Sequence, residues 1–600
     1  MVKKTIITAV LAVVMIASAA RAVDIMKVDD IRPGMKGYGL TVFSGSEPER
    51  FDVEIIAVIK KWSTGNDLIL GRVSGHNLEF TGVTSGMSGS PVYIDGKLIG
   101  AVAYGWSWTK EPVAGIQPIK HMLELWEKPA AGGGQVSGTR GSLPEPLLFK
   151  RTGDMRETIS KLEGRPKRAS MKASAGSLGE IELEQIKTPL MISGTGEMGM
   201  DVLGDLLGAY NIVPVAGGGD ADVPDGPGVD SLKAGGVVGS PLMRGDLRAG
   251  AIGTVTLRED DRLLAFGHSF FGEGPNRIPL SGGEIYHFLA NLQFSFKMGA
   301  VGRVLGTIVD DRLSAISGKI GDMPEYFPLS IEYENADTGE KREFKMEVAQ
   351  LKQTDSSMVM TAMVKSAVQF PMPQESTVRM VMDGRLKDYP RPFHYENMYV
   401  EPPDYAVYGP LLYLFDLLYN PYRDTSVAEL KIKMIVEKKR KLSGIIGASF
   451  AASTFHAGDV VKAYLRTKDY NEVEGVEEIS FRIPKDVPPG LLTVEIEGGG
   501  SMSGMPTEVL PEDFDGMFDI LLDWIPQNRI SVKFVYEENA LAVRGRELKA
   551  LPGSVGNTFD IGYDAKRKPF NRYERELIET DKVMFGKAIM SMNIEKEFQP

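Results

Sequence analysis

The most informative segment of the chain is Ser85-Gly-Met-Ser-Gly-Ser-Pro-Val-Tyr-Ile94, followed by Asp95-Gly96 and then by Lys97-Leu-Ile-Gly-Ala-Val102. Two short apolar runs joined by Asp-Gly predict a β-hairpin, because Asp-Gly supplies the positive φ angles that a two-residue type I′ turn requires. The glycines on both sides of Ser88 predict a tight turn with an exposed hydroxyl. We therefore expect a serine at the entrance to a β-hairpin.

This serine is a candidate nucleophile. A nucleophilic serine needs nearby backbone N–H groups that point at the developing oxyanion, and Gly86 and Ser88 would supply them. The nucleophile turn of the α/β-hydrolases needs G-x-S-x-G followed by a helix, whereas here Ser90 holds the fifth position and a strand follows. The pattern therefore favours a β-barrel peptidase over a lipase-like enzyme.

A serine hydroxyl also needs a base within hydrogen-bond reach. The chain has six histidines, and His268 directly follows a predicted hairpin and a glycine. His76 lies 12 residues before Ser88 and is the alternative base. No two histidines have the i, i+4 spacing of a zinc-binding helix, so we predict neither a metal site nor a cofactor.

Strand patterns continue on both sides of the serine motif. Residues 51–59 alternate with period two, and 67–73 predict a second strand. Residues 250–257 and 262–266 predict another hairpin, and further strands follow Pro328 at a spacing typical of β-sandwich modules. Helices are expected at 198–210, 410–418 and 512–525. We therefore expect a mainly β protein.

The chain is long enough for several domains, since it has 600 residues of ordinary globular composition. Glycine-rich stretches at 129–142 and 216–229 have linker composition and bracket a separate segment, in which residues 150–172 are basic and expected to form a solvated face. The predicted divisions are a signal peptide (1–22), a serine-bearing half (23–128), linkers with a small α/β segment (129–234), a histidine-bearing half (235–330), a β-rich module with a short helix (331–425) and a C-terminal β-rich module (426–600).

Charge and composition limit the partners. The net charge is −12, and an acidic surface repels polyphosphate, so nucleic-acid binding is disfavoured. The absence of cysteine removes disulfides, thiolate metal sites and cysteine catalysis. Met1-Val-Lys-Lys4, an apolar run and Ala20-Arg-Ala22 predict a signal peptide, hence a periplasmic or extracellular protein with no stable membrane span after cleavage.

Several motifs together resemble the SpoIVB-type serine peptidases, family S55. The most specific is Gly-Met-Ser-Gly-Ser-Pro followed by a hairpin. The matching stretches are Pro33-Gly-Met-Lys-Gly-Tyr-Gly39, Phe51-Asp-Val-Glu-Ile55, Ser85 to Ile94, Leu264-Ala-Phe-Gly-His268 and Gly306-Thr-Ile-Val-Asp-Asp-Arg312.

The resemblance implies a trypsin-like double β-barrel assembled from two separated segments, with Ser88 as nucleophile and His268 as general base. Serine precedes histidine by 180 residues, which indicates that the barrel halves are exchanged in order. The resemblance also implies an aspartate a short way before the serine, but the stretch Arg72-Val-Ser-Gly-His-Asn-Leu-Glu79 has no aspartate, and Ser74 is nearest to that place. The third member is therefore open, with Asp311 preferred and Asp246 and Asp67 as rivals.

These observations predict an exported serine endopeptidase that hydrolyses proteins or peptides through Ser88 and His268. The alternative is a catalytically inactive peptidase-like scaffold that binds proteins in the cell envelope. A hydrogen bond between Ser88 and His268 would favour the enzyme, and a gap wider than one water would favour the scaffold.

Overall fold

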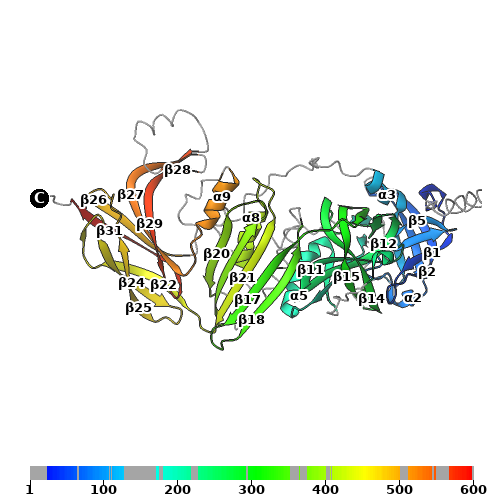
Figure 1. Ribbon diagram of the computed structural model, residues 1–600, viewed down its shortest axis with the longest axis horizontal. Helices are drawn as coiled ribbons and strands as arrows, with labels where there is room; N and C mark the ends of the chain where they lie inside the picture. Colours follow the sequence, from blue (N-terminus) through cyan, green and yellow to red (C-terminus); the bar gives the residue numbers. More distant parts are fainter. Residues whose placement is uncertain are drawn as a thin grey trace, which may run out of the picture.

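A computed structural model gives an elongated molecule, with the first strands at one end and the last strands at the other (Figure 1). Among the described residues, no helix is long and apolar enough to cross a membrane. The structure describes residues 23–63, 66–106, 109, 111–127, 171–174, 180–217, 227–291, 295–351, 364, 375–400, 406, 408–499, 511, 513–543, 546–548 and 567–596.

Six strands near the N-terminus close into a first barrel. The sheet runs β4-β1-β2-β3-β6-β5, and β4 also pairs with β5, so no edge is left between the first and last strand. Its interior is filled by buried apolar side chains that include Phe51, Val53 and Ile116. The elements are a 3-10 helix (Val28–Asp30), β1 (Lys36–Thr41), β2 (Glu49–Ser63), β3 (Asn66–Ser74), α2 (Leu78–Thr81), β4 (Pro91–Ile94), β5 (Lys97–Trp106), β6 (Val113–Pro118) and α3 (Ile119–Glu127).

The predicted hairpin at the serine motif is confirmed as β4 and β5. Asp95 and Gly96 at its turn have φ angles of 50° and 76°, as a type I′ turn requires. The predicted alternation in β2 is confirmed as far as Ile55, where the register with β3 shifts before Ala57. A shift of this kind moves the following side chains relative to the core, which ends the period of two.

A second group of six strands closes in the same way. The order is β12-β13-β16-β15-β14-β11, and β11 also pairs with β12. The predicted hairpin at 250–266 is confirmed as β12 and β13. The elements are a 3-10 helix (Val229–Ser231), β11 (Val237–Gly245), β12 (Arg248–Glu259), β13 (Arg262–Ala265), β14 (Gly274–Leu289), β15 (Phe296–Arg312) and β16 (Ala315–Ile320).

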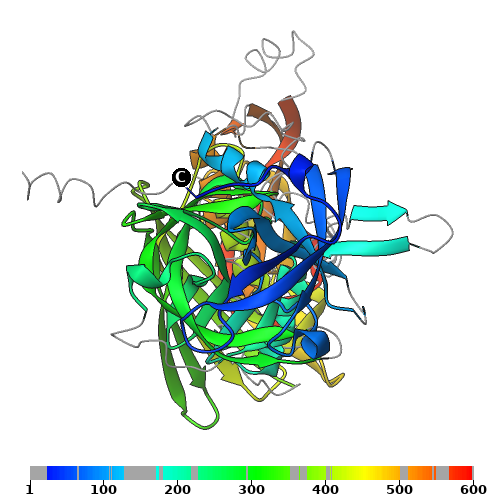
Figure 2. The ribbon, with the colours of Figure 1, turned by 90° about the vertical axis from the view of Figure 1, so that its right-hand side faces the viewer.

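The two barrels lie against each other (Figure 2). Backbone pairs join them directly, with Gly45 bridged to Ile285 and Ser85 bridged to Phe296. Trp126 Nε1 donates to Ser317 Oγ at 3.1 Å across the same interface. The expected mainly β fold, with two barrels built from separated segments, is therefore confirmed.

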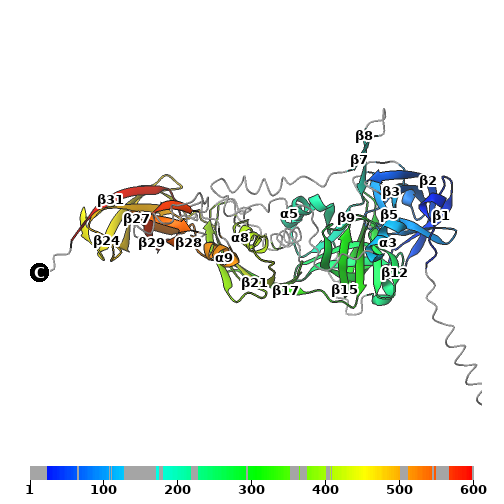
Figure 3. The same cartoon turned by 90° about the horizontal axis from the view of Figure 1, so that it is seen from above.

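The segment between the barrels adds strands to both sheets rather than forming a sheet of its own. β8 pairs with β5 of the first barrel, and β9 pairs with β12 of the second. Figure 3 shows β7 and β8 projecting from the first barrel. The predicted helix at 198–210 is confirmed, and residues 150–170 of the basic stretch lie outside the described residues. The elements are β7 (Met171–Ser174), β8 (Glu180–Gln185), β9 (Thr188–Ser193), α5 (Glu197–Leu207), a 3-10 helix (Gly208–Tyr210) and β10 (Ile212–Ala216).

The sheet of the second barrel continues into a middle module, because β18 pairs with β11. Helix α8 buries Leu411, Leu414 and Leu417 in the shared apolar core, and α9 packs beside it from much later in the chain. The predicted helices at 410–418 and 512–525 are thus confirmed. The elements are β17 (Tyr326–Asn335), β18 (Lys341–Ala349), β19 (Thr377–Leu386), β20 (Pro392–Tyr399), α8 (Tyr408–Leu418), β21 (Val427–Glu437) and α9 (Phe514–Leu522).

The C-terminal module is the expected β-sandwich. A four-stranded sheet, β25-β24-β22-β30, faces a second sheet built around β31, β26 and β27. Phe481 from one sheet and Phe534 from the other meet in the core with ring centroids 5.7 Å apart. The strands are β22 (Leu442–Phe450), β23 (Thr454–His456), β24 (Val460–Asp469), β25 (Glu474–Arg482), β26 (Gly490–Gly498), β27 (Arg529–Val543), β28 (Arg546–Leu548), β29 (Arg567–Glu579), β30 (Val583–Phe585) and β31 (Lys587–Glu595).

Candidate functional site at the barrel interface

The serine loop, residues 82–90, connects α2 to β4 and lies at the interface of the barrels. Gly86 and Gly89 have φ angles of 93° and 96°, which residues other than glycine rarely adopt. A Cβ added at Gly89 would lie 1.9 Å from the carbonyl oxygen of Thr254. The loop therefore needs glycine at this position both for its backbone conformation and for its contact with the second barrel.

Strand β12 of the second barrel holds the loop from outside. The Thr254 N–H donates to Ser88 O at 2.9 Å, and Thr254 Oγ1 donates to Gly86 O at 2.9 Å. Thr256 Oγ1 donates to Gly89 O at 2.7 Å. Three carbonyl groups of the loop are thus fixed by hydrogen bonds from the opposite barrel.

The N–H groups of the serine loop divide into two sets. Ser85, Met87, Gly89 and Ser90 donate to backbone carbonyl groups at 2.8 to 2.9 Å. Among the described residues, the N–H groups of Gly86 and Ser88 have no acceptor. One of these free N–H groups belongs to Ser88 itself and the other lies two residues before it, which is the kind of donor pair that an oxyanion hole requires.

The sequence predicts an exposed hydroxyl at Ser88, and this prediction is wrong. The side chain has 0% relative exposure, and its Oγ has no hydrogen-bond partner. The reason is that β12 and β15 of the second barrel cover the loop, which the local sequence pattern does not reveal. Ser90, two residues further on, is also fully buried with an unpartnered Oγ.

His268 lies in the loop that follows β13, as the sequence predicts. Its imidazole is 1% exposed, Nδ1 lies 2.8 Å from Ser269 O, and Nε2 has no hydrogen-bond partner. Because Nδ1 faces a carbonyl oxygen, it carries the proton in the neutral ring and leaves Nε2 as the free acceptor. Burial lowers the pKa of His268 to about 4, so the ring is neutral at pH 7.

The serine and histidine loops are neighbours. A Cβ added at Gly89 would lie 2.5 Å from the Phe266 nitrogen, and Gly267 packs against Ala101 and Ala103 of β5. The structure therefore brings together two loops that are 180 residues apart in sequence. Ser88 Oγ and His268 Nε2 do not form a hydrogen bond with each other, since neither atom has a partner.

Asp311, the preferred third member, is fully buried near the end of β15. Its Oδ1 accepts from the Phe270 N–H at 2.8 Å, and its Oδ2 accepts from those of Phe271 and Gly272 at 2.6 and 2.7 Å. The carboxylate thus anchors the backbone just after His268. The proton of His268 Nδ1 meets Ser269 O instead, so Asp311 supports the histidine loop rather than the ring.

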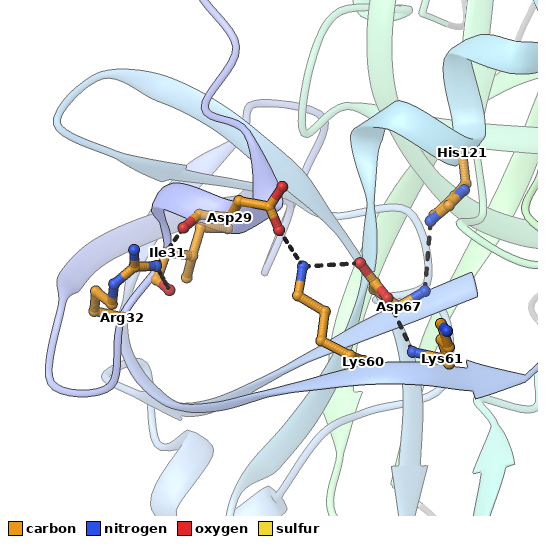
Figure 4. Close-up of polar contacts among 7 residues, drawn as sticks. All are labelled: Asp29, Ile31, Arg32, Lys60, Lys61, Asp67 and His121. Atoms are coloured by element: carbon orange, nitrogen blue, oxygen red, sulfur yellow. Dashed lines mark hydrogen bonds and ion pairs between the residues drawn. The ribbon is translucent and has the colours of Figure 1, made fainter. Parts of the chain in front are cut away.

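The rival acids Asp67 and Asp246 have partners away from both loops, and Figure 4 shows those of Asp67. Asp67 Oδ2 lies 3.0 Å from Lys60 Nζ, and its backbone N–H donates to His121 Nε2 at 3.5 Å. Lys60 also pairs with Asp29 at 2.6 Å. Asp246 Oδ2 accepts from the Lys345 N–H at 2.7 Å in the middle module.

His76, the alternative base, belongs to an aromatic cluster. Its ring stacks on Phe43 with centroids 4.1 Å apart, and its Nδ1 lies 3.9 Å from Glu49 Oε2. These contacts place its ring against Phe43 and an exposed carboxylate. Among the described residues, no group of three or more histidine and acidic side chains could hold a metal ion.

The sequence pattern missed one buried group beside the serine loop. Lys297, near the start of β15, has 0% exposure, and its Nζ lies 2.6 Å from Thr41 Oγ1 and 3.4 Å from Thr254 Oγ1. Burial lowers the pKa of Lys297 to about 7. A lysine among the apolar and glycine residues of β15 is the signal that could have indicated it.

The fold is thus that of a mainly β protein with two closed barrels, and Ser88 from one barrel and His268 from the other lie in loops at their interface. Residues 6–120 match the family model described as SpoIVB peptidase S55. The expected S55 resemblance is therefore confirmed over the first barrel, which includes Ser88, whereas His268 lies outside the matched residues. No curated protein and no solved structure matches the chain.

Proposed function

We propose that this chain is an exported serine endopeptidase that cleaves protein substrates with Ser88 as nucleophile and His268 as general base. The observation that carries the proposal is the pair of acceptor-free N–H groups at Gly86 and Ser88, within the S55-matched segment. Backbone N–H groups are costly to leave unpaired in a buried loop, which argues that a ligand oxygen completes them.

In this mechanism Ser88 Oγ attacks the carbonyl carbon of the scissile peptide bond, and its proton passes to His268 Nε2. The N–H groups of Gly86 and Ser88 donate to the resulting oxyanion. The C–N bond then breaks, the leaving amine takes the proton from His268, and an acyl-serine remains. Water hydrolyses this ester by the same sequence of proton transfers.

Substrate binding must open the site first, because Ser88 and His268 are both buried. Export follows from the predicted signal peptide at residues 1–22, and N-terminal sequencing of the secreted protein should begin at Val23. We expect neither a stable membrane span after cleavage of the signal peptide nor a nucleic-acid partner.

A second candidate function is a non-catalytic binding protein of the cell envelope. The specific observation in its favour is that Ser88 Oγ and His268 Nε2 lack a mutual hydrogen bond. The position of Asp311, which binds backbone N–H groups instead of the imidazole, points the same way.

Hydrolysis of an unfolded protein, such as fluorescein-labelled casein, separates the two functions. The enzyme should release labelled peptides, and Ser88→Ala should lower the rate at least about a thousandfold. Ser90→Ala is the matched control, because Ser90 is also a buried hydroxyl of the same loop without a partner. A well-folded wild-type protein that binds casein without cutting it would leave the binding protein as the function.

A further inference from the structure

Lys297 is the strongest chemical feature that the proposed mechanism does not use. The aliphatic part of its side chain packs against the serine loop, where a Cβ added at Gly86 would lie 3.1 Å from Lys297 Cδ. The backbone beside it is tied to the same loop, since the Lys297 N–H donates to Ser85 O at 2.9 Å. The lysine therefore contacts the oxyanion segment along both its main chain and its side chain.

The amino group ends at a junction of three parts of the molecule. It binds Thr41 Oγ1 from β1 and approaches Thr254 Oγ1 from β12, while the Phe288 ring centroid lies 5.4 Å away. The same Thr254 hydroxyl donates to Gly86 O. Two hydrogen bonds thus connect the lysine Nζ to the carbonyl group of an oxyanion residue.

This amine is costly to bury. Among the described residues it forms no ion pair, and a buried ammonium without a carboxylate is destabilising by several kcal/mol. A methionine of similar length would fill the same space without that cost. Breaches of packing rules of this kind concentrate at functional sites.

We propose that Lys297 is a positioning residue of the oxyanion loop, which acts through Thr254 and places an ammonium group beneath Gly86. The inference rests on the proposed peptidase function. A positive charge in this dry interface favours the negative charge that develops at the N–H groups of Gly86 and Ser88 during acyl transfer. Loss of the lysine proton should therefore slow the reaction.

Four other titratable groups lie on elements near this junction: His268, His287, His76 and Glu49. His268 follows β13, and its pKa is lowered to about 4, well below that of the lysine. His287 on β14 is paired in register with Met298 and is exposed. His76, which stacks on Phe43, and Glu49 are both partly exposed, so water screens their interaction with the lysine.

The test is the rate of labelling by a fluorophosphonate probe from pH 4 to pH 10. Wild type should show a bell-shaped profile, with an acid limb from His268 and an alkaline limb near pH 7 from Lys297. Lys297→Met should lose the alkaline limb and label about tenfold more slowly at pH 6. Lys297→Arg keeps the charge, so its rate should stay level above pH 7.

Variants of Thr254 test the same connection without changing Lys297. Thr254→Val removes the connecting hydroxyl and should slow labelling about as much as Lys297→Met, whereas Thr254→Ser should retain the wild-type rate. Lys319→Met, at an exposed lysine of β16, is the control and should behave as wild type. Wild-type rates and a wild-type pH profile in Lys297→Met would overturn the inference.

Backbone hydrogen exchange tests the positioning role of Lys297 without relying on the proposed peptidase activity. The peptide that spans residues 82–91 should exchange several times faster in Lys297→Met than in Lys319→Met, whether or not the protein is an enzyme. Absence of wild-type labelling at every pH would refute the peptidase proposal. Equal exchange in the two variants would refute the positioning role of Lys297.

Discussion

At the scale of single residues, the central feature is a histidine that is neutral because it is buried. The pKa of His268 is lowered to about 4 from its ordinary 6.5, and a general base works only when unprotonated. Probe labelling should therefore fall on the acid side with a midpoint near pH 4. His268→Ala should lose most of the rate and this limb together. A midpoint near 6.5 would mean that the ring is solvated during the reaction.

Lys297 should also reduce the stability of the fold in a pH-dependent way. Its pKa is about 7 in the folded protein and about 10.5 in the unfolded chain, which therefore binds the proton more tightly. Above pH 10.5 the lysine is neutral in both states and costs no stability. As the pH falls from 10.5 to 7, the unfolded chain takes up the proton first, so the free energy of unfolding decreases. The full difference is about 5 kcal/mol.

Urea denaturation at pH 6, 8 and 10 would measure this effect. Lys297→Met should be more stable than wild type at pH 6, and the difference should shrink as the pH rises. Lys319→Met should show no such trend. If the difference in the free energy of unfolding between Lys297→Met and wild type did not change with pH, the pKa of Lys297 would be the same in the folded and unfolded states.

At the scale of elements, the serine loop depends on the approach of β12. Gly89→Ala would place a methyl group 1.9 Å from Thr254 O at a φ of 96°, and should lower the free energy of unfolding by at least about 2 kcal/mol. Gly75→Ala has a similar φ of 89° with nothing within 4 Å, so it should cost only the backbone strain. If Gly89→Ala and Gly75→Ala lowered the free energy of unfolding equally, the contact between the serine loop and β12 would contribute nothing to stability.

The elements that could be predicted from sequence are those fixed by local chemistry. Asp95-Gly96 determines a type I′ turn, and the helix at α8 follows from its apolar run. Barrel closure was expected from the family resemblance alone, because in sequence the β4–β5 and β11–β12 pairings that complete each ring are indistinguishable from ordinary hairpins. The joining of β8 and β9 to different barrels likewise depends on contacts between distant strands.

The candidate site shows the same division. The structure places Ser88 and His268 in adjacent loops, and of the two only Ser88 lies in the segment that matches the S55 family model. The burial of both side chains, the backbone partners of Asp311 and the place of Lys297 depend on packing between the barrels. Local pattern carries no information about such contacts, so these features appear only in three dimensions.

At the scale of the whole molecule, the proposed site depends on the contact between the two barrels. The pairs Gly45 with Ile285 and Ser85 with Phe296 cross the interface, and β8 joins the first barrel from beyond the glycine-rich stretch. A protease cut engineered at Gly132–Gly134 should therefore leave the fragments associated and able to react with the probe. Gel filtration in native buffer and in urea would measure this association.

The separately expressed halves, 23–128 and 235–330, should be insoluble, because each would expose apolar surface and unpaired strand edges. The second barrel also shares its sheet with the middle module through β11 and β18, which exposes a further edge if the chain stops at 330. Soluble halves that melt independently and never reconstitute labelling would contradict a shared site.

The most direct test is the position of the fluorophosphonate adduct in the full-length protein, mapped by peptide mass spectrometry. The adduct should lie on Ser88, and Ser88→Ala should abolish it with an unchanged melting temperature, since a loop hydroxyl without partners adds little to packing. An adduct on Ser85 or Ser90, or undiminished labelling of a folded Ser88→Ala protein, would contradict the account.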